Sequence, residues 1–478
     1  MVNPTSATNA PVHVRQLGAL GYAVLIVASL WFWHQLQWKD PLLMAANIGM
    51  LVLGVWPMLR WLKRHDATYP IMEFLLLATV PFYALPVLTG HEDLALYPES
   101  ILLQASLVVL AFQAACIAGS ALATRRQPPR HYQGEWWRNE ILPETRMHFT
   151  AYTAGATTLW LLLTSFTDWF PTDWIGTLRA VFFGIGIISV FIQARLWGGG
   201  HLSRAYKLLF WINVLSQVTL MLVSLLLING IGLLLTAFVG YFSSARRVPW
   251  LPVLLLLPII AVLHNGKSQM RQIYWSYGQT RMGFSDLPAY FSQWVDFGLS
   301  ADKQGKETES TTLTYGLMRR ASLFQIVCIA VDTMPGRSPF LHGSSYEILL
   351  PQLVPRFLWP GKPSPHESVK LLSVQLGILT EEETETTSIG FGMLTEAYAN
   401  FGYLCVIVLG GIFGYLFRRL ADGTVDCATL SMAGLLRILC LVWCLNAETT
   451  LAVWFSSLYQ ACLAIGVPLL LTRSFLKD

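Results

Sequence analysis

Charged residues are scarce in this sequence, and their scarcity excludes a soluble globular protein. Only 13% of the 478 residues are Asp, Glu, Lys or Arg, whereas 54% are hydrophobic and the mean hydropathy is +0.50. Soluble domains carry about 25% charged residues, so this chain has too little charge to solvate a surface of its size. The net charge of +4 points to no particular partner, because in a membrane protein the distribution of charge between the two sides of the membrane matters more than its total.

Cysteine pairs, carboxylate clusters and nucleotide-binding motifs are also sparse. The chain has 7 cysteines, and their spacing is not that of metal or redox sites. The only dense acidic run is EEETETTS, residues 381–388, so we expect no metal ion and no other cofactor. Glycine-rich phosphate loops and nucleic-acid motifs are lacking, so nucleic acid is not an expected partner.

Apolar runs of about twenty residues recur along the chain, and each is long enough to cross the hydrocarbon core as a helix. They are too long and too apolar for the strands of a membrane barrel. The sequence therefore predicts an all-α, polytopic membrane protein with about 12 transmembrane helices. The predicted spans are residues 17–36, 41–60, 71–90, 99–123, 149–168, 174–195, 207–228, 229–244, 249–264, 403–418, 431–446 and 451–471.

The basic residues of the short loops predict the orientation of these spans. If the N-terminus is cytoplasmic, every inside turn carries Lys or Arg, such as Arg60 and Arg64. The short outside turns then carry mainly acidic residues, such as Glu92 and Asp93. This is the positive-inside pattern, and it predicts that both termini are cytoplasmic.

The predicted topology divides the chain into three regions. An N-terminal transmembrane region with about nine spans covers residues 1–264, and a C-terminal transmembrane region with about three spans covers residues 403–478. Between the ninth and tenth spans lies one large extracytoplasmic loop, residues 265–402, which is rich in cations and prolines. Proline lowers the entropy that a loop loses on ordering, so this loop can hold side chains in fixed positions.

Short helices are expected within the large loop. Residues 265–300 are basic and aromatic, which favours short helices at the membrane surface. Residues 319–335 hold an apolar run too short to span, so we expect a helix packed on the bundle or dipping into the interface. An amphipathic helix is predicted from about His366 to Gly377, and residues 395–402 lead into the tenth span.

Two stretches of this loop carry a resemblance to a known family. They are PRFLWPGKP, from Pro355 to Pro363, and EAYANFG, from Glu396 to Gly402. With the long apolar part before them, they resemble the O-antigen polymerase (Wzy-type) family of oligosaccharide repeat-unit polymerases. The similarity is strongest over residues 315–415. The arginine–ten residues–glycine repeat described for some members does not start at Arg356, because residue 367 is Glu.

The resemblance implies a glycosyltransferase of the bacterial inner (cytoplasmic) membrane. Such an enzyme polymerises undecaprenyl-pyrophosphate-linked oligosaccharide repeat units into O-antigen, capsule or exopolysaccharide on the periplasmic face. Donor and acceptor are both lipid-linked glycans, and the membrane lipids, a chain-length regulator and a flippase are further expected partners. An acceptor hydroxyl attacks the anomeric carbon of the donor, and the lipid pyrophosphate leaves without any metal ion.

This chemistry needs fixed cations and a proton acceptor. Negative charge builds on the departing pyrophosphate, so cations placed in advance would stabilise the transition state. Arginine suits this role best, because its planar fork binds phosphate oxygens bidentately. A carboxylate or imidazole must take the acceptor's proton, and the candidate bases are Glu396 and His366. The candidate pyrophosphate or substrate ligands are Arg281, Arg319, Arg320, Arg337, Arg356, Lys362, Tyr398 and Asn400.

Each candidate also has a purely structural interpretation. The loop cations would equally pair with acidic side chains or lipid headgroups. His366 would be an ordinary residue at a helix start, and Glu396 would cap nearby backbone. Arg437, inside the eleventh predicted span, needs a partner in a membrane, for which Glu448 or a lipid phosphate is the candidate.

Two other functions remain open from the sequence. An O-antigen ligase-type transferase would use the same donor but the lipid A core as acceptor. A lipid-linked oligosaccharide flippase or another transporter would also have many spans. Transporters, however, usually show internal repeats and interrupted helices with polar residues at midplane. In this chain the charges gather instead in one loop, and its spans are poor in Asp, Glu and Lys.

The most specific prediction from the sequence concerns substitutions of Arg356. Arg356→Ala is expected to abolish polymer while single repeat units and protein abundance stay unchanged, because the leaving pyrophosphate would lose a bidentate partner. Arg356→Lys is expected to be poor as well, since lysine offers a point charge in place of a fork. Both variants are checked by separating the glycans of expressing cells on a gel. Normal polymer in the alanine variant would remove Arg356 from the site.

Overall fold

A computed structural model gives the structure of the chain, and helices are the regular secondary structure of the part described. No strand occurs among these residues. The structure describes residues 12–35, 40–64, 69–125, 143–167, 169, 172–225, 227–245, 249–276, 283–304, 323–354, 358–385, 388–428 and 431–475.

The chain forms two compact units, which are described separately. Unit 1 comprises residues 1–140, 316–354 and 361–458, and unit 2 comprises residues 141–315, 355–360 and 459–478. The described elements of unit 1 are α1 (Val12–Gln35), α2 (Pro41–Arg64), α3 (Ile71–Thr79), the π-helical turn η1 (Val80–Ala84), α4 (Leu85–Leu88), η2 (Glu92–Leu96), α5 (Glu99–Arg125), α14 (Leu323–Thr333), η4 (Leu350–Leu353), α15 (Glu367–Gln375), η5 (Glu383–Glu385), α16 (Gly392–Gly423) and α17 (Met432–Trp443).

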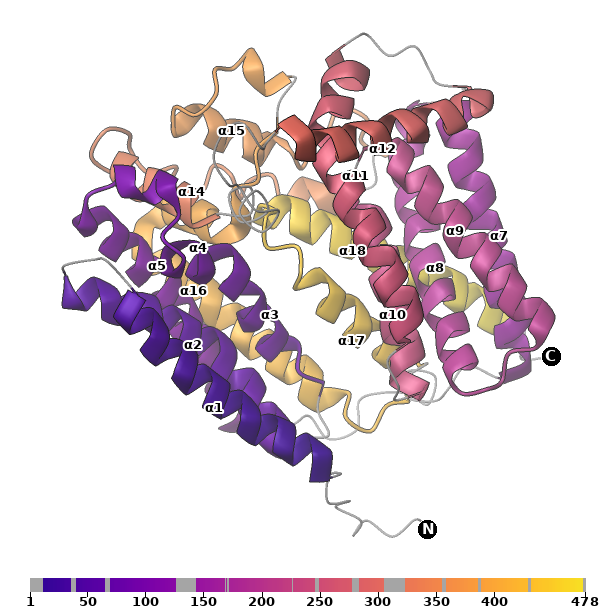
Figure 1. Ribbon diagram of the computed structural model, residues 1–478, viewed down its shortest axis with the longest axis horizontal. Coiled ribbons are helices and arrows are strands. Elements are labelled where there is room, and N and C mark those ends of the chain that lie inside the picture. Colours follow the sequence, from indigo (N-terminus) through magenta and orange to yellow (C-terminus); the bar gives the residue numbers. More distant parts are fainter. Residues whose placement is uncertain are drawn as a thin grey trace. The chain divides into compact units, whose positions relative to one another are not determined.

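Unit 2 is built from consecutive helices, shown in magenta to red in Figure 1. A last helix, α18 (Leu451–Phe475), starts within unit 1 and ends within unit 2. The described elements of unit 2 are α7 (Pro143–Phe166), α8 (Thr172–Gly198), α9 (Arg204–Val223), α10 (Leu227–Ala245), α11 (Trp250–Ser276), η3 (Phe284–Asp286) and α12 (Leu287–Gln304).

The described helices support the prediction of a helical membrane protein. Among the described residues, 6 helices are long and apolar enough to cross a membrane. They are Pro41–Lys63, Ile71–Leu88, Glu99–Thr124, Arg204–Val223, Trp250–Lys267 and Gly392–Gly423. Every predicted apolar run overlaps a described helix, and several of the other runs fall on shorter apolar helices such as α17.

Close contact between α5 and α16 depends on glycine. Gly410 and Gly414 lie one turn apart on α16, and each faces a backbone carbonyl of α5. A Cβ atom added at Gly410 would lie 2.6 Å from the carbonyl oxygen of Phe112, and one at Gly414 would be closer still to Cys116. Small residues at this spacing let two membrane helices approach backbone to backbone, which places α16 firmly against α5.

The end of α11 differs from the prediction for residues 265–300. No separate surface helix starts at residue 265, because α11 continues without interruption to Ser276. Gly266 lets α12 pack closely there, and the Trp294 indole N–H donates to the carbonyl of Leu263 at 2.7 Å. The predicted boundary at residue 264 therefore falls inside a helix that α12 crosses (Figure 1).

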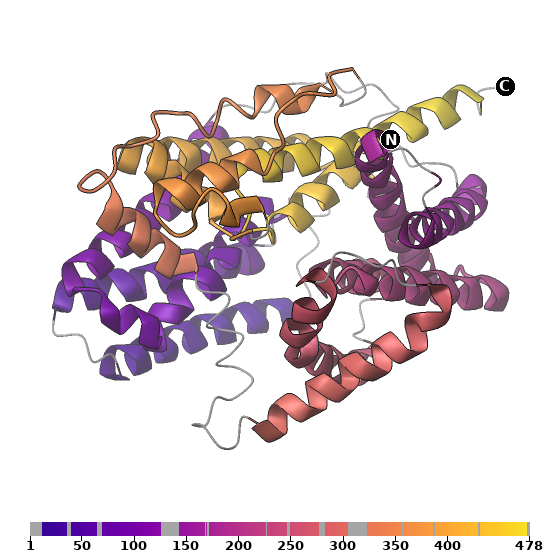
Figure 2. The same cartoon turned by 90° about the horizontal axis from the view of Figure 1, so that it is seen from above.

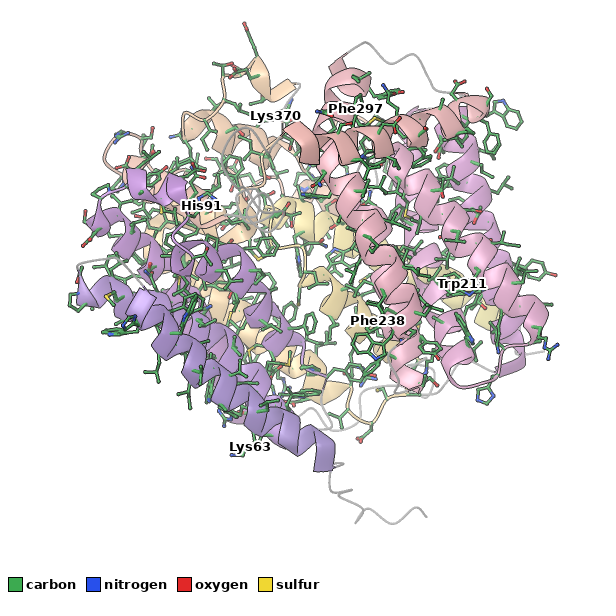
Figure 3. All side chains as sticks on the ribbon, viewed as in Figure 1. Lys63, His91, Trp211, Phe238, Phe297 and Lys370 are labelled. Atoms are coloured by element: carbon green, nitrogen blue, oxygen red, sulfur yellow. The ribbon has the colours of Figure 1, made fainter. Side chains whose placement is uncertain are left out.

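Aromatic rings fill the core between α8, α9 and α10 in unit 2. Trp211, labelled in Figure 3, lies edge-on to Trp197 with ring centroids 5.5 Å apart. Trp197 also meets Tyr241 of α10 edge-on at 5.4 Å. Such edge-to-face pairs add to the stability that burial alone provides, so these rings help to hold α8, α9 and α10 together.

Two of the short helices predicted within residues 265–402 are present. The apolar run within residues 319–335 forms α14, whose Phe324, Val327 and Cys328 are buried in the core of unit 1. The amphipathic helix predicted from His366 forms α15, with His366 as the residue before its first turn. Both predictions are confirmed, and the chain between α14 and α15 is largely irregular (Figure 1 and Figure 2).

Arg437 on α17 has different partners from those expected. Its guanidinium donates to the carbonyl oxygens of Thr424, at 2.5 Å, and of Cys427, at 3.1 Å. The Tyr69 ring lies beneath it, 4.2 Å from the guanidinium carbon to the ring centroid. The charge is thus satisfied by backbone dipoles and a π face, whereas the sequence suggested Glu448 or a lipid phosphate.

The glycine contact predicts a large difference between two neighbouring substitutions. Gly414→Ala is expected to destabilise the protein by roughly 1–3 kcal/mol or more, because the added methyl group overlaps the α5 backbone. Gly411→Ala is the matched control, since a Cβ there has no described atom within 4 Å. Thermal unfolding of both variants in detergent measures the effect. Equal unfolding temperatures would contradict the tight α5–α16 contact.

Candidate functional site

The described candidate residues lie in unit 1, on the loop after α14 and on the first part of α16. Four of the predicted cations, Arg281, Arg319, Arg320 and Arg356, lie outside the described residues. Of the remaining candidates, His366 and Arg337 are exposed, and the rest are buried: Lys362, Glu396, Tyr398 and Asn400. This contrast in exposure separates the residues that can meet a substrate from those that shape the site.

A break divides α16 into two helical parts. Phe401 and Gly402 have non-helical backbone angles, and Gly402 has a φ of 62° with a ψ of −146°. Only glycine adopts that conformation readily. Every residue of the first part, Gly392–Asn400, is buried. The second part begins at Tyr403, where the sequence placed the start of the tenth span.

The loop segment Leu341–Ser345 docks onto this break. The N–H groups of Leu341 and His342 donate to the carbonyl oxygens of Ala399, at 2.9 Å, and Asn400, at 3.2 Å. The Asn400 side chain completes the junction. Its Oδ1 accepts from the N–H of Gly343 at 2.9 Å, and its Nδ2 donates to Ser345 Oγ at 2.8 Å. A single buried amide therefore fixes the loop to the helix.

Two aromatic rings also pack at this junction, one from the loop and one from the helix. Phe340 of the loop lies over Gly402, where an added Cβ would come within 3.3 Å of its ring. Phe401 of the helix lies over Gly343, where an added Cβ would come within 3.5 Å of its ring. An added Cβ would be crowded by Phe340 at Gly402, whereas at Gly343 it would only make ordinary van der Waals contact with Phe401.

His342 has an unusual backbone conformation at this junction. Its φ is 48°, in the left-handed region that few residues other than glycine adopt. Such a conformation costs roughly 1–3 kcal/mol, and each hydrogen bond of the junction returns about 0.5–1.5 kcal/mol. The bonds at Leu341, His342 and Gly343 together suffice to hold it. The His342 side chain is exposed, and its ring meets Phe401 edge-on at 6.0 Å between centroids.

Glu396 lies too deep to act on a substrate in this conformation. Its side chain is 0% exposed, and Oε2 accepts a hydrogen bond of 2.5 Å from the N–H of Leu451. Leu451 is the first residue of α18, so the carboxyl group caps a helix N-terminus by accepting from a backbone N–H that has no partner within the helix. The backbone that it caps is remote in sequence, and the residue joins two helices.

The start of α18 also holds α15. Ser368 Oγ and Thr450 Oγ1 are 2.8 Å apart, and both side chains are buried. Thr450 precedes the first residue of α18, and Ser368 lies in the first turn of α15. One helix N-terminus therefore fixes both the first part of α16, through Glu396, and the helix that begins after His366.

His366 is the described candidate base that solvent can reach. Its side chain is exposed. The surrounding protein still removes part of the ring's hydration, which lowers the pKa of His366, while the neighbouring Glu367 acts in the opposite direction. At neutral pH the ring is therefore mostly uncharged and can accept a proton.

Lys362, Arg337 and Tyr398 have structural contacts. The ammonium group of Lys362 donates to the carbonyl oxygens of Val354, at 2.6 Å, and Pro351, at 3.5 Å. Arg337 pairs with Asp332 at 2.7 Å on the surface, where such a pair is weak and easily exchanged. The Tyr398 ring packs between Phe340 and Tyr403. Of these residues, Arg337 stays accessible to an anionic ligand.

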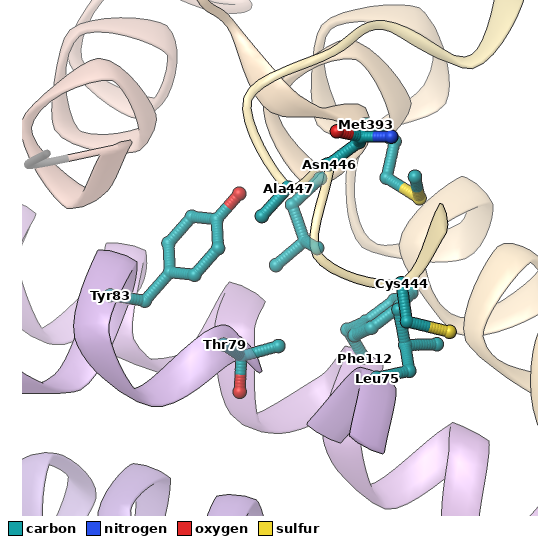
Figure 4. Close-up of a pocket in the computed structure, with 9 residues that line it drawn as sticks. Leu75, Thr79, Tyr83, Phe112, Met393, Cys444, Asn446 and Ala447 are labelled. Atoms are coloured by element: carbon teal, nitrogen blue, oxygen red, sulfur yellow. The ribbon is translucent and has the colours of Figure 1, made fainter. Parts of the chain in front are cut away.

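A small cavity lies behind the first part of α16. It has a volume of about 20 Å³ and is lined by Leu75, Thr79, Tyr83, Phe112, Met393, Leu394, Cys444, Asn446 and Ala447. Figure 4 shows the Tyr83 ring pointing toward Ala447 across this space. The volume suits about one water molecule, so the cavity is too small for a sugar. Among the described residues, His, Cys, Asp and Glu form no group that could hold a metal ion.

Sequence reasoning missed His342, Ser345 and Ser368. Their partners are distant in the chain, at Asn400 and Thr450, so no local spacing marks them. A glycine directly after His342 was the one available signal, because glycines often accompany left-handed turns. The chain matches no protein-family model, no curated protein sequence and no solved structure.

The junction predicts a specific role for the Asn400 amide. Asn400→Ala leaves the N–H of Gly343 without its partner and is expected to cost roughly 1–3 kcal/mol. The loop around Leu341 should then be cleaved faster by a protease added to the solubilised protein. Ser344→Ala is the control, because the Ser344 hydroxyl donates to the nearby carbonyl of Leu341, within the same turn. Unchanged cleavage in Asn400→Ala would show that the amide does not hold the loop.

Proposed function

We propose that this protein is a membrane glycosyltransferase that polymerises undecaprenyl-pyrophosphate-linked oligosaccharide repeat units. The product would be an O-antigen, capsule or exopolysaccharide, made on the periplasmic face of a bacterial inner membrane. In this proposal the chain has about 12 spans, cytoplasmic termini and a periplasmic loop from residue 265 to 402. The resemblance of PRFLWPGKP and EAYANFG to the polymerase family supports it.

The loop–helix junction is the observation that best supports this function. A transferase acting on lipid-linked substrates needs groups held in place beside a membrane helix before the bond breaks. The Asn400 amide and the backbone bonds of Leu341 and His342 hold the loop in that way. The junction lies where the sequence places the extracytoplasmic end of the tenth span, next to the lipid carrier.

His366 suits the role of general base better than Glu396. The acceptor's hydroxyl oxygen forms a bond to the anomeric carbon, the bond from that carbon to the pyrophosphate oxygen breaks, and the hydroxyl proton moves to the base. His366 is exposed and mostly neutral, as a proton acceptor should be. Glu396 is enclosed and bonded to Leu451, so we assign it a positioning role. Arg356 and Arg337 would bind the leaving pyrophosphate.

The test uses purified protein with a synthetic polyprenyl-pyrophosphate repeat unit, without added metal, and products separated on a gel. A ladder of added repeats is the expected result. Transfer only to a lipid A core acceptor would favour the ligase-type reaction. Movement of the lipid-linked unit across a proteoliposome membrane, without any transfer, would favour a flippase and overturn the proposal.

The lowered pKa of His366 predicts the pH dependence of the ladder. An unperturbed histidine titrates at about 6.5, so we expect the rate to stay high to a lower pH than that before it falls. His366→Gln is expected to lose most activity at every pH. The same shift makes the unfolded chain bind the proton more readily, so stability should fall slightly as the pH drops below about 6.5. Full activity of His366→Gln would exclude it as the base.

A further inference from the structure

An aromatic pair at the α16 break remains exposed to solvent, although one of its two rings packs on the loop. His342 and Phe401 are both exposed, with Phe401 44% accessible to solvent. They come from segments far apart in the sequence, and their rings meet edge-on at 6.0 Å. We call these two residues the aromatic platform.

The platform is built to stay in position. The His342 N–H bonds the carbonyl oxygen of Asn400, and the next N–H, of Gly343, bonds the Asn400 side chain. The Phe401 ring rests on Gly343, where even a Cβ would come within 3.5 Å. Part of the phenyl ring therefore lies near the backbone of Gly343, while part of it remains open to solvent.

The chemistry of the platform fits a pyranose ring. The apolar C–H face of a sugar packs on an aromatic face. An imidazole beside it can donate a hydrogen bond to a sugar hydroxyl or accept one from it. Lipid contact would require only apolar surface, and it gives no reason for a histidine held in a left-handed conformation at φ 48°. Backbone conformations of this kind persist where the surrounding structure enforces them, often at functional sites.

We infer that His342 and Phe401 form a sugar-binding subsite that stacks a pyranose of the glycan on Phe401 and hydrogen-bonds it through His342. This inference rests on the proposed function, because it names where the glycan of the lipid-linked substrate lies. It assigns binding to the platform, and no bond is made or broken there.

The central variant is Phe401→Leu, which keeps an apolar side chain and removes the aromatic face. In the ladder assay it should raise the KM for the lipid-linked repeat about fivefold to tenfold with little change in kcat. Phe401→Tyr should restore wild-type behaviour. His342→Gln, which retains hydrogen-bonding groups, should have a smaller effect than His342→Ala. Leu404→Ala is the matched control, because Leu404 is exposed one turn further along α16.

A binding measurement separates this inference from the proposed function. The probe is the oligosaccharide released by mild acid from the lipid-linked intermediates of cells carrying this gene. Saturation-transfer NMR against protein in nanodiscs should show contact with ring protons for wild type and Phe401→Tyr, and a loss for Phe401→Leu. Empty nanodiscs give the background.

The outcomes are distinguishable. A wild-type ladder together with unchanged KM and NMR signal in Phe401→Leu would show that Phe401 is only a lipid anchor, and the subsite would be wrong while the polymerase stands. Aromatic-dependent binding without a ladder would support the subsite and overturn the polymerase. An absence of both binding and ladder in wild type would overturn both.

Discussion

The hydrogen bonds of the α16 break are the constraint on which the loop depends. A continuous helix would pair the carbonyls of Ala399 and Asn400 with N–H groups one turn further on. The break at Phe401 and Gly402 releases them, and buried carbonyls must find other partners. The N–H groups of Leu341 and His342 supply those partners. The helix can therefore break only where the loop docks, and the loop has a defined position only because the helix breaks.

Both parts of α16 are fixed independently of this junction. The second part lies against α5 through Gly410 and Gly414, whose missing side chains permit backbone contact. The first part is tied through Glu396 to the N-terminus of α18, which also holds α15 through Thr450 and Ser368. Motion at the break would have to disturb one of these contacts. The exposed residues near it thus belong to a rigid framework, which favours binding of a substrate in a single orientation.

The sequence predicted the elements better than their partners. Hydropathy and length identify the membrane helices and α14, and the proline-rich segment before His366 predicts the start of α15, because both signals are local. The basic and aromatic residues after position 264 predicted separate short helices, whereas α11 continues to Ser276 and α12 packs on it at Gly266. The partners of Asn400, Glu396 and Arg437 could not be read at all. These partners are brought together only by the tertiary fold, and local sequence spacing carries no information about tertiary contacts.

The burial of each side chain changes which of the two candidate bases, Glu396 or His366, suits that role. A carboxylate and an imidazole are equally good candidates for a base on paper, yet a base must reach the proton it removes. Glu396 is enclosed and already accepts the N–H of Leu451, whereas His366 faces solvent two residues before Ser368, which the same helix start anchors. The buried acid and the exposed imidazole therefore suit complementary tasks. In the proposed reaction, the acid would position the helices, and the imidazole, held by that framework, would exchange a proton with the substrate.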